Sequence, residues 1–211
     1  MNAKDVAGWF QRYADVIEEK KAWLTELDSA VGDGDHGANM ARGWKEVRNQ
    51  LKTFEGGLPE VFLLVSRTLI SKVGGASGPL YGTAFLRMSM FLKGKEEIGH
   101  DDWPALLKAA SEGIGQRGKV NGGEKTMYDV WAVVSETAEK RAGEPVRTSH
   151  LLEWAREKAE AIRDLRALKG RAAYLGDRSV GHRDPGAEST VLLFETLHQT
   201  VSSRGGNGRE R

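Results

Sequence analysis

Apolar residues recur with the period of an α-helix along almost the whole chain. In the first predicted helix, which covers residues 6–27, Val6, Phe10, Tyr13 and Ile17 follow one another at spacings of three or four and therefore share one face. Seven further segments repeat this spacing, and no alternating run of apolar and polar residues is long enough to predict a strand. The pattern predicts an all-α protein with eight helices.

Helix start signals separate these apolar faces. Thr126, with Asp129 three residues later, resembles a capping box and predicts the start of the sixth helix, and Thr148 or Ser149 caps the seventh. Proline is favoured in the first turn of a helix, and the prolines near the third, fourth, fifth and last starts are Pro59, Pro79, Pro104 and Pro185. We therefore expect an eight-helix antiparallel up-and-down barrel or bundle.

Glycine is the residue type in clear excess. The chain has 26 glycines among 211 residues, or about 12%, against a usual share of roughly 7%. They gather in predicted loops at 32–37, 74–78, 113–123 and 170–186. These loops are alternate connections between the helices, and alternate connections of an up-and-down bundle lie at the same end. We therefore expect the four loops to meet at one rim and to form the functional site there.

Composition and charge exclude several classes of function. The chain has no cysteine, which excludes disulfide scaffolds and thiolate chemistry. Its net charge of +1 predicts no broad basic surface for nucleic acid. No apolar stretch is long enough for a signal peptide or a membrane span, so we expect a cytoplasmic protein. We expect one domain over residues 1–202 and a disordered tail over 203–211, which is poor in apolar residues.

Three aspartates lie at the first glycine-rich loop, namely Asp28, Asp33 and Asp35. Two like charges about 4 Å apart repel by roughly 4 kcal/mol near a protein surface, so clustered carboxylates favour a shared cation. Carboxylate oxygens without cysteine favour Mg²⁺ or Ca²⁺, and Mg²⁺ completes its shell with water and phosphate oxygens. The start of the next helix, near Asn39, offers free N–H groups to a phosphate. The alternative is a solvated acidic turn in which Asp33 or Asp35 caps the helix.

The other glycine-rich loops also carry residues suited to an anion. Ser77 lies among glycines at 74–78, where backbone N–H groups can approach a phosphate, and a plain turn is the alternative. Arg171 and Arg178 are candidates to meet a phosphate or an adenine ring, or they form a basic loop before a helix. His36 is a candidate ligand contact beside the aspartates.

Four ordered motifs resemble the nucleotide-binding L subunit of dihydroxyacetone kinase. They are LD at 27–28 with GDGDHG at 32–37, NM at 39–40 and RG at 42–43, then VGGASGPLYGT at 73–83, GK at 118–119 with KTMYDVW at 125–131, and KGRAAYLGDRSVGHRDPGA at 169–187. Four specific motifs in this order exceed what chance glycines produce, and the resemblance covers nearly the whole chain.

The resemblance implies an all-helical barrel of eight antiparallel helices with ADP or ATP bound at one rim. It implies that Asp28, Asp33 and Asp35 coordinate two Mg²⁺ ions that bridge the nucleotide phosphates. Phosphoryl transfer then depends on the charge of the metal ions and on the positioning of the phosphoryl group, and no protein general base takes part. The residues that the resemblance places against the nucleotide are His36, Asn39, Ala76, Ser77, Gly118, Met127, Arg171, Asp184, Pro185 and Gly186.

The resemblance also implies partners. In this family a separate K subunit holds dihydroxyacetone through a histidine, and a phosphohistidine carrier of the sugar phosphotransferase system, the M subunit, rephosphorylates bound ADP. The leading hypothesis is a kinase subunit that keeps ADP as a coenzyme. The alternatives are the small subunit of an ATP-dependent kinase for dihydroxyacetone or a tetrulose, and a non-catalytic regulatory nucleotide-binding module. Neither nucleic acid nor a membrane is expected as a partner.

Overall fold

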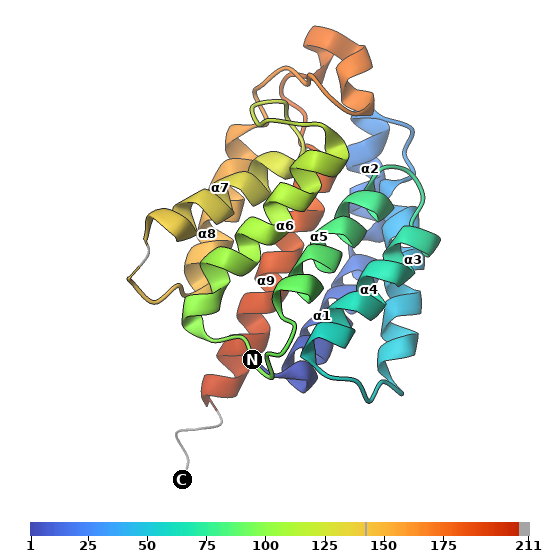
Figure 1. Ribbon diagram of the computed structural model, residues 1–211. Coiled ribbons are helices and arrows are strands. Elements are labelled where there is room, and N and C mark those ends of the chain that lie inside the picture. Colours follow the sequence, from blue (N-terminus) through green and yellow to red (C-terminus); the bar gives the residue numbers. More distant parts are fainter. Residues whose placement is uncertain (142, 207–211) are drawn as a thin grey trace.

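A computed structural model describes residues 1–141 and 143–206 (Figure 1). Within these residues the chain forms helices and no strand, apart from an isolated bridge between Asn2 and Glu97. The α-helices are α1 (Ala3–Glu19), α2 (Lys21–Val31), α3 (His36–Leu51), α4 (Leu58–Lys72), α5 (Ser77–Phe91), α6 (Trp103–Gly118), α7 (Met127–Lys140), α8 (Thr148–Ala161) and α9 (Pro185–Gly206), with the short 3₁₀ helices η1 (His100–Asp102) and η2 (Arg171–Ser179). The all-α prediction is confirmed.

The helices close into a barrel. From α3 to α9 each helix packs against the next, and α1 closes the ring by packing against both α3 and α9. Figure 1 shows that consecutive helices of this ring run in opposite directions, with the start of α1 and the end of α9 at the lower end. The connections α2–α3, α4–α5, α6–α7 and α8–α9 therefore lie together at the upper end, as the loop order predicts.

The first predicted helix is divided into two. Lys20, with φ −88° and ψ 5°, lies between α1 and α2, although its N–H still donates to the oxygen of Val16 at 2.8 Å. The described residues consequently contain nine α-helices, and α1 and α2 together occupy the place that the sequence assigns to one. The break falls in the run Glu18–Lys21, where no apolar residue marks a preferred helix face.

Most predicted helix starts agree with the structure. The Thr126 side chain accepts a hydrogen bond from the N–H of Tyr128 at 3.2 Å, and Asp129 accepts one from the N–H of Thr126 at 2.8 Å, which is the predicted capping box. The predicted cap of α8 is wrong, because the capping position is Arg147. Thr148 instead contacts Nδ1 of His198 at 3.2 Å and so joins α8 to α9.

Two glycine-rich stretches are more ordered than expected. Gly113 and Gly115 lie inside α6. Glycine fits there because a side chain would come too close to its neighbours: a Cβ would lie 2.8 Å from Cγ of Arg87 at Gly113 and 2.9 Å from the Tyr128 ring at Gly115. The connection between α8 and α9 contains η2. At the other end of the chain α9 continues to Gly206, and residues 207–211 of the predicted tail lie outside the described residues.

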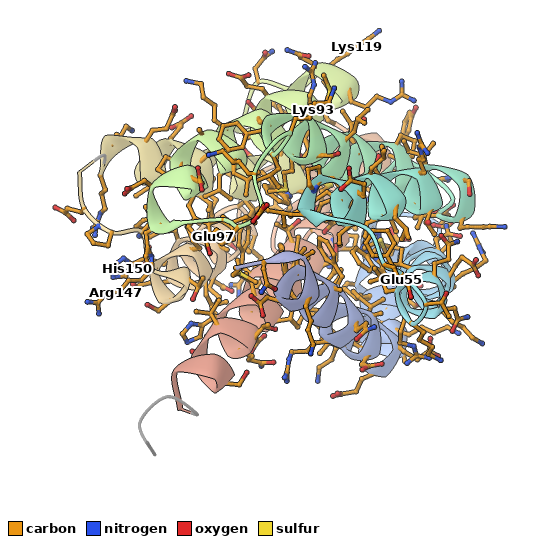
Figure 2. The ribbon with its side chains drawn as sticks, turned by 60° about the horizontal axis from the view of Figure 1, so that its bottom comes forward. Glu55, Lys93, Glu97, Lys119, Arg147 and His150 are labelled. Atoms are coloured by element: carbon orange, nitrogen blue, oxygen red, sulfur yellow. The ribbon has the colours of Figure 1, made fainter. Side chains whose placement is uncertain are left out.

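The core is a continuous apolar cluster inside the barrel. Phe10 of α1 lies with ring centroids 5.7 Å from Trp44, 5.4 Å from Phe62 and 5.1 Å from Phe85, which joins four helices. Trp9 donates to the oxygen of Leu193 at 3.0 Å and anchors α1 to α9. Figure 2 shows polar side chains extending from the outside of the barrel. No helix among residues 1–141 and 143–206 combines the length and the apolar character needed to cross a membrane.

Candidate functional site

The glycine-rich connections line a cavity of about 510 Å³ at the upper end of the barrel. Its walls come from the end of α2, the starts of α3, α5, α7 and α9, the end of α6 and the beginning of η2. A cavity of this size is typical of a small-molecule site. The structure therefore brings together four segments that are far apart in the sequence.

Every site residue that the resemblance implies lines this cavity, and their individual roles stay predictions. Arg178, which the sequence offers as a further basic candidate, is exposed on η2 and does not line it. The predicted residues found in the cavity are Asp28, Asp33, Asp35, His36, Asn39, Ala76, Ser77, Gly118, Met127, Arg171, Asp184, Pro185 and Gly186.

The three aspartates form a compact carboxylate cluster. Each of Asp28, Asp33 and Asp35 offers one oxygen, and these oxygens lie within 4.8 Å of one another. Oδ2 of the buried Asp28 accepts hydrogen bonds from the N–H groups of Asp35 at 2.8 Å and His36 at 3.0 Å, which fixes the loop between α2 and α3. Asp33 pairs with Nη2 of Arg171 at 2.8 Å. Hard oxygen donors this close together suit a divalent cation such as Mg²⁺.

The structure places Asp35 at the capping position of α3, as the capping alternative predicts, but the Asp35 side chain makes no capping hydrogen bond. The helix α5 also begins without a side-chain cap, at Ala76. The N–H of His36 already donates to Asp28, and Pro79 has no N–H, so the first-turn donors that face a ligand are those of Gly37 and Ala38 in α3 and of Ser77 and Gly78 in α5. Two helix N-termini at one cavity attract a phosphate.

His36 is held between two hydroxyl groups at the inner end of the cavity. Its Nδ1 lies 3.1 Å from Oγ of Ser77, and its Nε2 lies 3.1 Å from Oγ of Ser189. Oγ of Ser189 also contacts the oxygen of Gly186 at 3.0 Å and the hydroxyl of Tyr81 at 2.9 Å. Because both ring nitrogens of His36 have a hydroxyl partner, the ring is fixed in one orientation.

His36 is expected to stay neutral in the free protein across the physiological pH range. Burial lowers its pKa from 6.5 to about 4, against the opposing charges of Asp28 and Asp35. Its ring resonances, identified by their loss in His36→Gln, should not titrate between about pH 5.5 and 8 in an NMR series. The unfolded chain binds this proton more readily, so the contribution of His36 to stability falls as the pH drops from 6.5 toward about 4. A titration midpoint near the ordinary value would contradict the assignment.

Asn39 is positioned by Arg42, which belongs to the first motif of the family resemblance. Nη2 of Arg42 donates to Oδ1 of Asn39 at 2.6 Å, and Nε of Arg42 donates to the oxygen of Lys72 at 3.0 Å. The bond to Lys72 ties the start of α3 to the end of α4. The amide of Asn39 therefore faces the cavity with its oxygen already engaged, which leaves its NH₂ group as the free donor.

Asp184 brings a fourth carboxylate to the cavity at the start of α9. It accepts a hydrogen bond from the N–H of Ala187 at 2.7 Å, which caps the first turn. Burial, together with the charges of Asp129 and Asp28, raises the pKa of Asp184 to about 7, although the hydrogen bond from Ala187 and the charge of Lys125 lower it. A cation bound at the carboxylate cluster lowers this pKa again, so cation binding and ionisation of Asp184 favour each other.

Part of the cavity lining is apolar. The lining includes Leu80, Ile114, Val120, Met127 and Pro185. Apolar side chains and a carboxylate cluster in one cavity suit a ligand with an aromatic end and an anionic end. The sequence does not identify Ile114 as a site residue, because an apolar residue in a helix is indistinguishable there from a core residue, and Val120, just after α6, carries no local signal of its own.

The fold and this cavity define a closed all-helical barrel with a carboxylate-rich site at one rim. A family model described as the DAK2 domain matches residues 30–199. The chain is 46% identical over 196 residues to "PEP-dependent dihydroxyacetone kinase 1, ADP-binding subunit DhaL" of Listeria innocua, covering 92% of this chain and 95% of the relative. It is also 46% identical over 195 residues to "PTS-dependent dihydroxyacetone kinase, ADP-binding subunit DhaL" of Lactococcus lactis, with coverages of 92% and 95%. The chain belongs to the DAK2 domain family.

A solved structure has the same fold. The crystal structure of the dihydroxyacetone kinase from C. freundii in complex with AMP-PNP and Mg²⁺ superposes with a TM-score of 0.70 at 22% identity. The match covers 92% of this chain and 33% of that chain, so this protein spans about a third of the larger kinase. The shared part is the helical barrel.

Proposed function

We propose that this protein is the nucleotide-binding subunit of a dihydroxyacetone kinase, with residues 1–202 as its nucleotide-binding domain. The observation that carries the proposal is the cluster of Asp28, Asp33 and Asp35 within 4.8 Å, beside the uncapped N-termini of α3 and α5. The two relatives that are 46% identical over nearly their whole length are named as ADP-binding subunits of such kinases. The acceptor, dihydroxyacetone, is then held by a partner subunit.

The donor set fits Mg²⁺, and we propose two ions held by Asp28, Asp33 and Asp35. Only carboxylate oxygens make up this cluster, and Mg²⁺ prefers such hard ligands with phosphate and water completing its shell. When bound, Mg²⁺ neutralises negative charge on the transferring phosphoryl group. Arg171, already paired with Asp33, supplies a further positive charge at the mouth of the cavity.

The remaining residues bind and orient the nucleotide. The N–H groups at Ala76 and Ser77 face the phosphates, and His36 holds the Ser77 hydroxyl in place. The apolar part of the lining, which includes Met127, receives the adenine ring, while Gly118 and the start of α9 at 184–186 border it. The protein contributes by positioning the phosphoryl group, in keeping with phosphoryl transfer as an electrostatically controlled reaction.

The names of the relatives favour one phosphoryl donor. They describe PEP-dependent and PTS-dependent kinases with an ADP-binding subunit. We infer that ADP remains bound as a coenzyme in this protein and is rephosphorylated by a phosphohistidine carrier, the M subunit, before transfer to dihydroxyacetone on the K subunit. Such a carrier system places the protein in the cytoplasm.

Removing Mg²⁺ is the direct test of the proposed site. A ligand at about 100 times its Kd stabilises a fold by roughly 2.7 kcal/mol, which raises the Tm of a chain this long by about 5–10 °C. We expect ADP with Mg²⁺ to give a shift of this size in differential scanning fluorimetry, and ADP with EDTA to give almost none. An equal shift with and without Mg²⁺ would contradict the metal assignment.

The kinase activity itself needs the partner subunits. The chain is mixed with a K subunit and dihydroxyacetone, and triose phosphate is measured with either phosphocarrier or ATP as the donor. Product from the phosphocarrier supports the coenzyme mechanism, and product from ATP alone supports the conventional kinase. Tight ADP binding without product from either donor would identify a regulatory module instead.

A further inference from the structure

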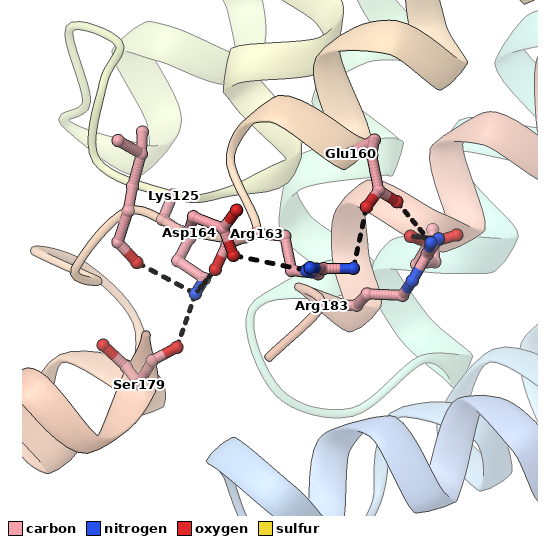
Figure 3. Close-up of polar contacts among 8 residues, drawn as sticks. Lys125, Glu160, Arg163, Asp164, Ser179 and Arg183 are labelled. Atoms are coloured by element: carbon pink, nitrogen blue, oxygen red, sulfur yellow. Dashed lines mark hydrogen bonds and ion pairs between the residues drawn. The ribbon is translucent and has the colours of Figure 1, made fainter. Parts of the chain in front are cut away.

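Lys125 is a buried lysine immediately before α7, and the chain segment that follows α8 surrounds its ammonium group. The residue is only 2% exposed. Its Nζ donates to the carbonyl oxygens of Arg163 at 2.7 Å, Leu165 at 2.9 Å and Ser179 at 2.5 Å. Figure 3 shows the ammonium between these groups. All three N–H donors are thus satisfied, and carbonyl dipoles replace the water that the charge loses on burial.

The three carbonyls belong to residues 163–181, here called the η2 segment, which forms the projection at the top of Figure 1. Further hydrogen bonds close this segment on itself. The N–H of Gly181 donates to the oxygen of Arg163 at 3.0 Å. Oγ of Ser179 accepts from the N–H of Ala167 at 2.9 Å and donates to the oxygen of Gly176 at 2.6 Å. Lys125 therefore holds both ends of a closed loop.

The η2 segment has few apolar contacts with the barrel. A small cluster in which Val31 of α2 meets Ala167 is separate from the main core. The N–H of Leu168 donates to the oxygen of Glu124 at 3.1 Å, directly beside Lys125. With so little buried apolar surface, polar anchors decide where the segment lies.

This segment forms one wall of the candidate nucleotide cavity. Residues 169–172 line the cavity, and Arg171 pairs there with Asp33. Thr126 and Met127 also line it, whereas Lys125 does not. The ammonium therefore does not border the ligand space. It acts on the cavity through the position of the η2 segment and through its charge, which lowers the pKa of Asp184.

The backbone at Lys125 supports a specific role for its side chain. Its φ of 61° lies in the left-handed region, which favours glycine. The nearby Gly122 and Gly123, with φ of 97° and 73°, adopt positive φ without a side chain. A residue other than glycine is uncommon in this conformation, and at Lys125 it coincides with three hydrogen bonds from the side chain to the η2 segment.

We propose that Lys125 is a positioning residue whose ammonium pins the η2 segment beside the cavity and thereby sets how slowly a bound nucleotide leaves. The inference rests on the proposed nucleotide-binding function. Nucleotide release requires Arg171 and its neighbours to move away from the phosphates. Without the ammonium the three carbonyls lose their charged donor, and those of Arg163 and Ser179 keep only the N–H groups of Gly181 and His182. The segment therefore opens more often and release becomes faster.

The release rate of a fluorescent ADP analogue tests this role. The N-methylanthraniloyl derivative is bound with Mg²⁺ and chased with unlabelled ADP in a stopped-flow instrument. Lys125→Met should release it about tenfold faster or more, because charged hydrogen bonds are lost. Lys108→Met removes an exposed lysine that pairs with Glu139, and Ser89→Ala removes a buried hydrogen bond to Pro59. Both controls should keep the wild-type rate, even where Ser89→Ala lowers the Tm.

A second variant keeps the proposal testable if Lys125→Met does not fold. Ser179→Ala leaves the carbonyl in place but loses the hydrogen bonds to Ala167 and Gly176, and release should accelerate about threefold. Amide hydrogen exchange of residues 165–181 in the nucleotide-free protein should also be faster in these variants than in the controls. Wild-type exchange and release in the folded variants would overturn the proposal. Failure of the wild-type protein to bind Mg²⁺ and ADP would instead contradict the proposed function, and the exchange measurement would still decide whether Lys125 pins the segment.

Discussion

Replacing Asp33 with asparagine is expected to weaken binding of Mg²⁺ and ADP by about 100-fold, equivalent to roughly 2.7 kcal/mol. The substitution removes one negative charge from a cluster whose oxygens lie within 4.8 Å of one another. The attraction between a carboxylate charge and a cation charge about 4 Å away is roughly 4 kcal/mol per pair of unit charges near a protein surface. Part of this loss is offset, because a neutral asparagine is desolvated more easily than a carboxylate. Asparagine keeps the size of the side chain, so the loss reports on charge.

The free protein should tolerate this change. In the absence of a ligand Asp33 interacts with Arg171, whose side chain is 62% exposed, and exposed ion pairs contribute little to stability. Isothermal titration calorimetry and the Tm without ligand separate the two effects. Asp177→Asn is the matched control, since Asp177 forms an exposed pair with Arg166 in the same η2 segment. An Asp33 variant with the Kd of the control would contradict the metal assignment.

Asp28→Ala is expected to lose both nucleotide binding and stability of the fold. Its carboxylate accepts hydrogen bonds from the N–H groups of Asp35 and His36, and alanine leaves both donors without a partner. An unsatisfied buried donor costs about 1–3 kcal/mol, so we expect a loss of roughly 3 kcal/mol in the free energy of unfolding. The corresponding fall in Tm is about 6–12 °C for a chain of this length.

Two further variants separate the roles of this carboxylate. Asp28→Asn retains an oxygen that can accept both N–H groups, so it should lose Mg²⁺ and ADP binding with less than half of the stability loss. Asp35→Ala should lose binding with almost no change in the Tm of the free protein, because the Asp35 side chain makes no capping hydrogen bond. Urea denaturation without ligand measures the stability of each variant. Equal stability of Asp28→Ala and Asp35→Ala would contradict the structural role of Asp28.

The all-α class and most helix starts can be predicted from the sequence, because they depend on local patterns. The spacing of Val6, Phe10 and Tyr13 reflects the period of a helix, and the Thr126–Asp129 capping box is a short-range motif. The break at Lys20 carries no such signal, because residues 18–21 are polar and equally compatible with a continuous helix. Gly113 and Gly115 were misassigned to a loop, since only contacts with Arg87 and Tyr128 reveal why a helix contains glycine there.

The position of the site is also predictable, because alternate connections of an up-and-down barrel must lie at one end. The three aspartates and the glycine-rich loops therefore favour a cation and an anion at this rim, and the resemblance to the kinase subunit adds the nucleotide. The structure was needed to find the partners of these residues: Asp28 as the anchor of its own loop, His36 between Ser77 and Ser189, and Lys125 under the η2 segment. The helix period and the residue types of a loop depend on residues that are neighbours in the sequence. The carbonyl oxygens that accept hydrogen bonds from the buried ammonium of Lys125 come from residues up to 54 positions away, and only the packing of the chain brings them together.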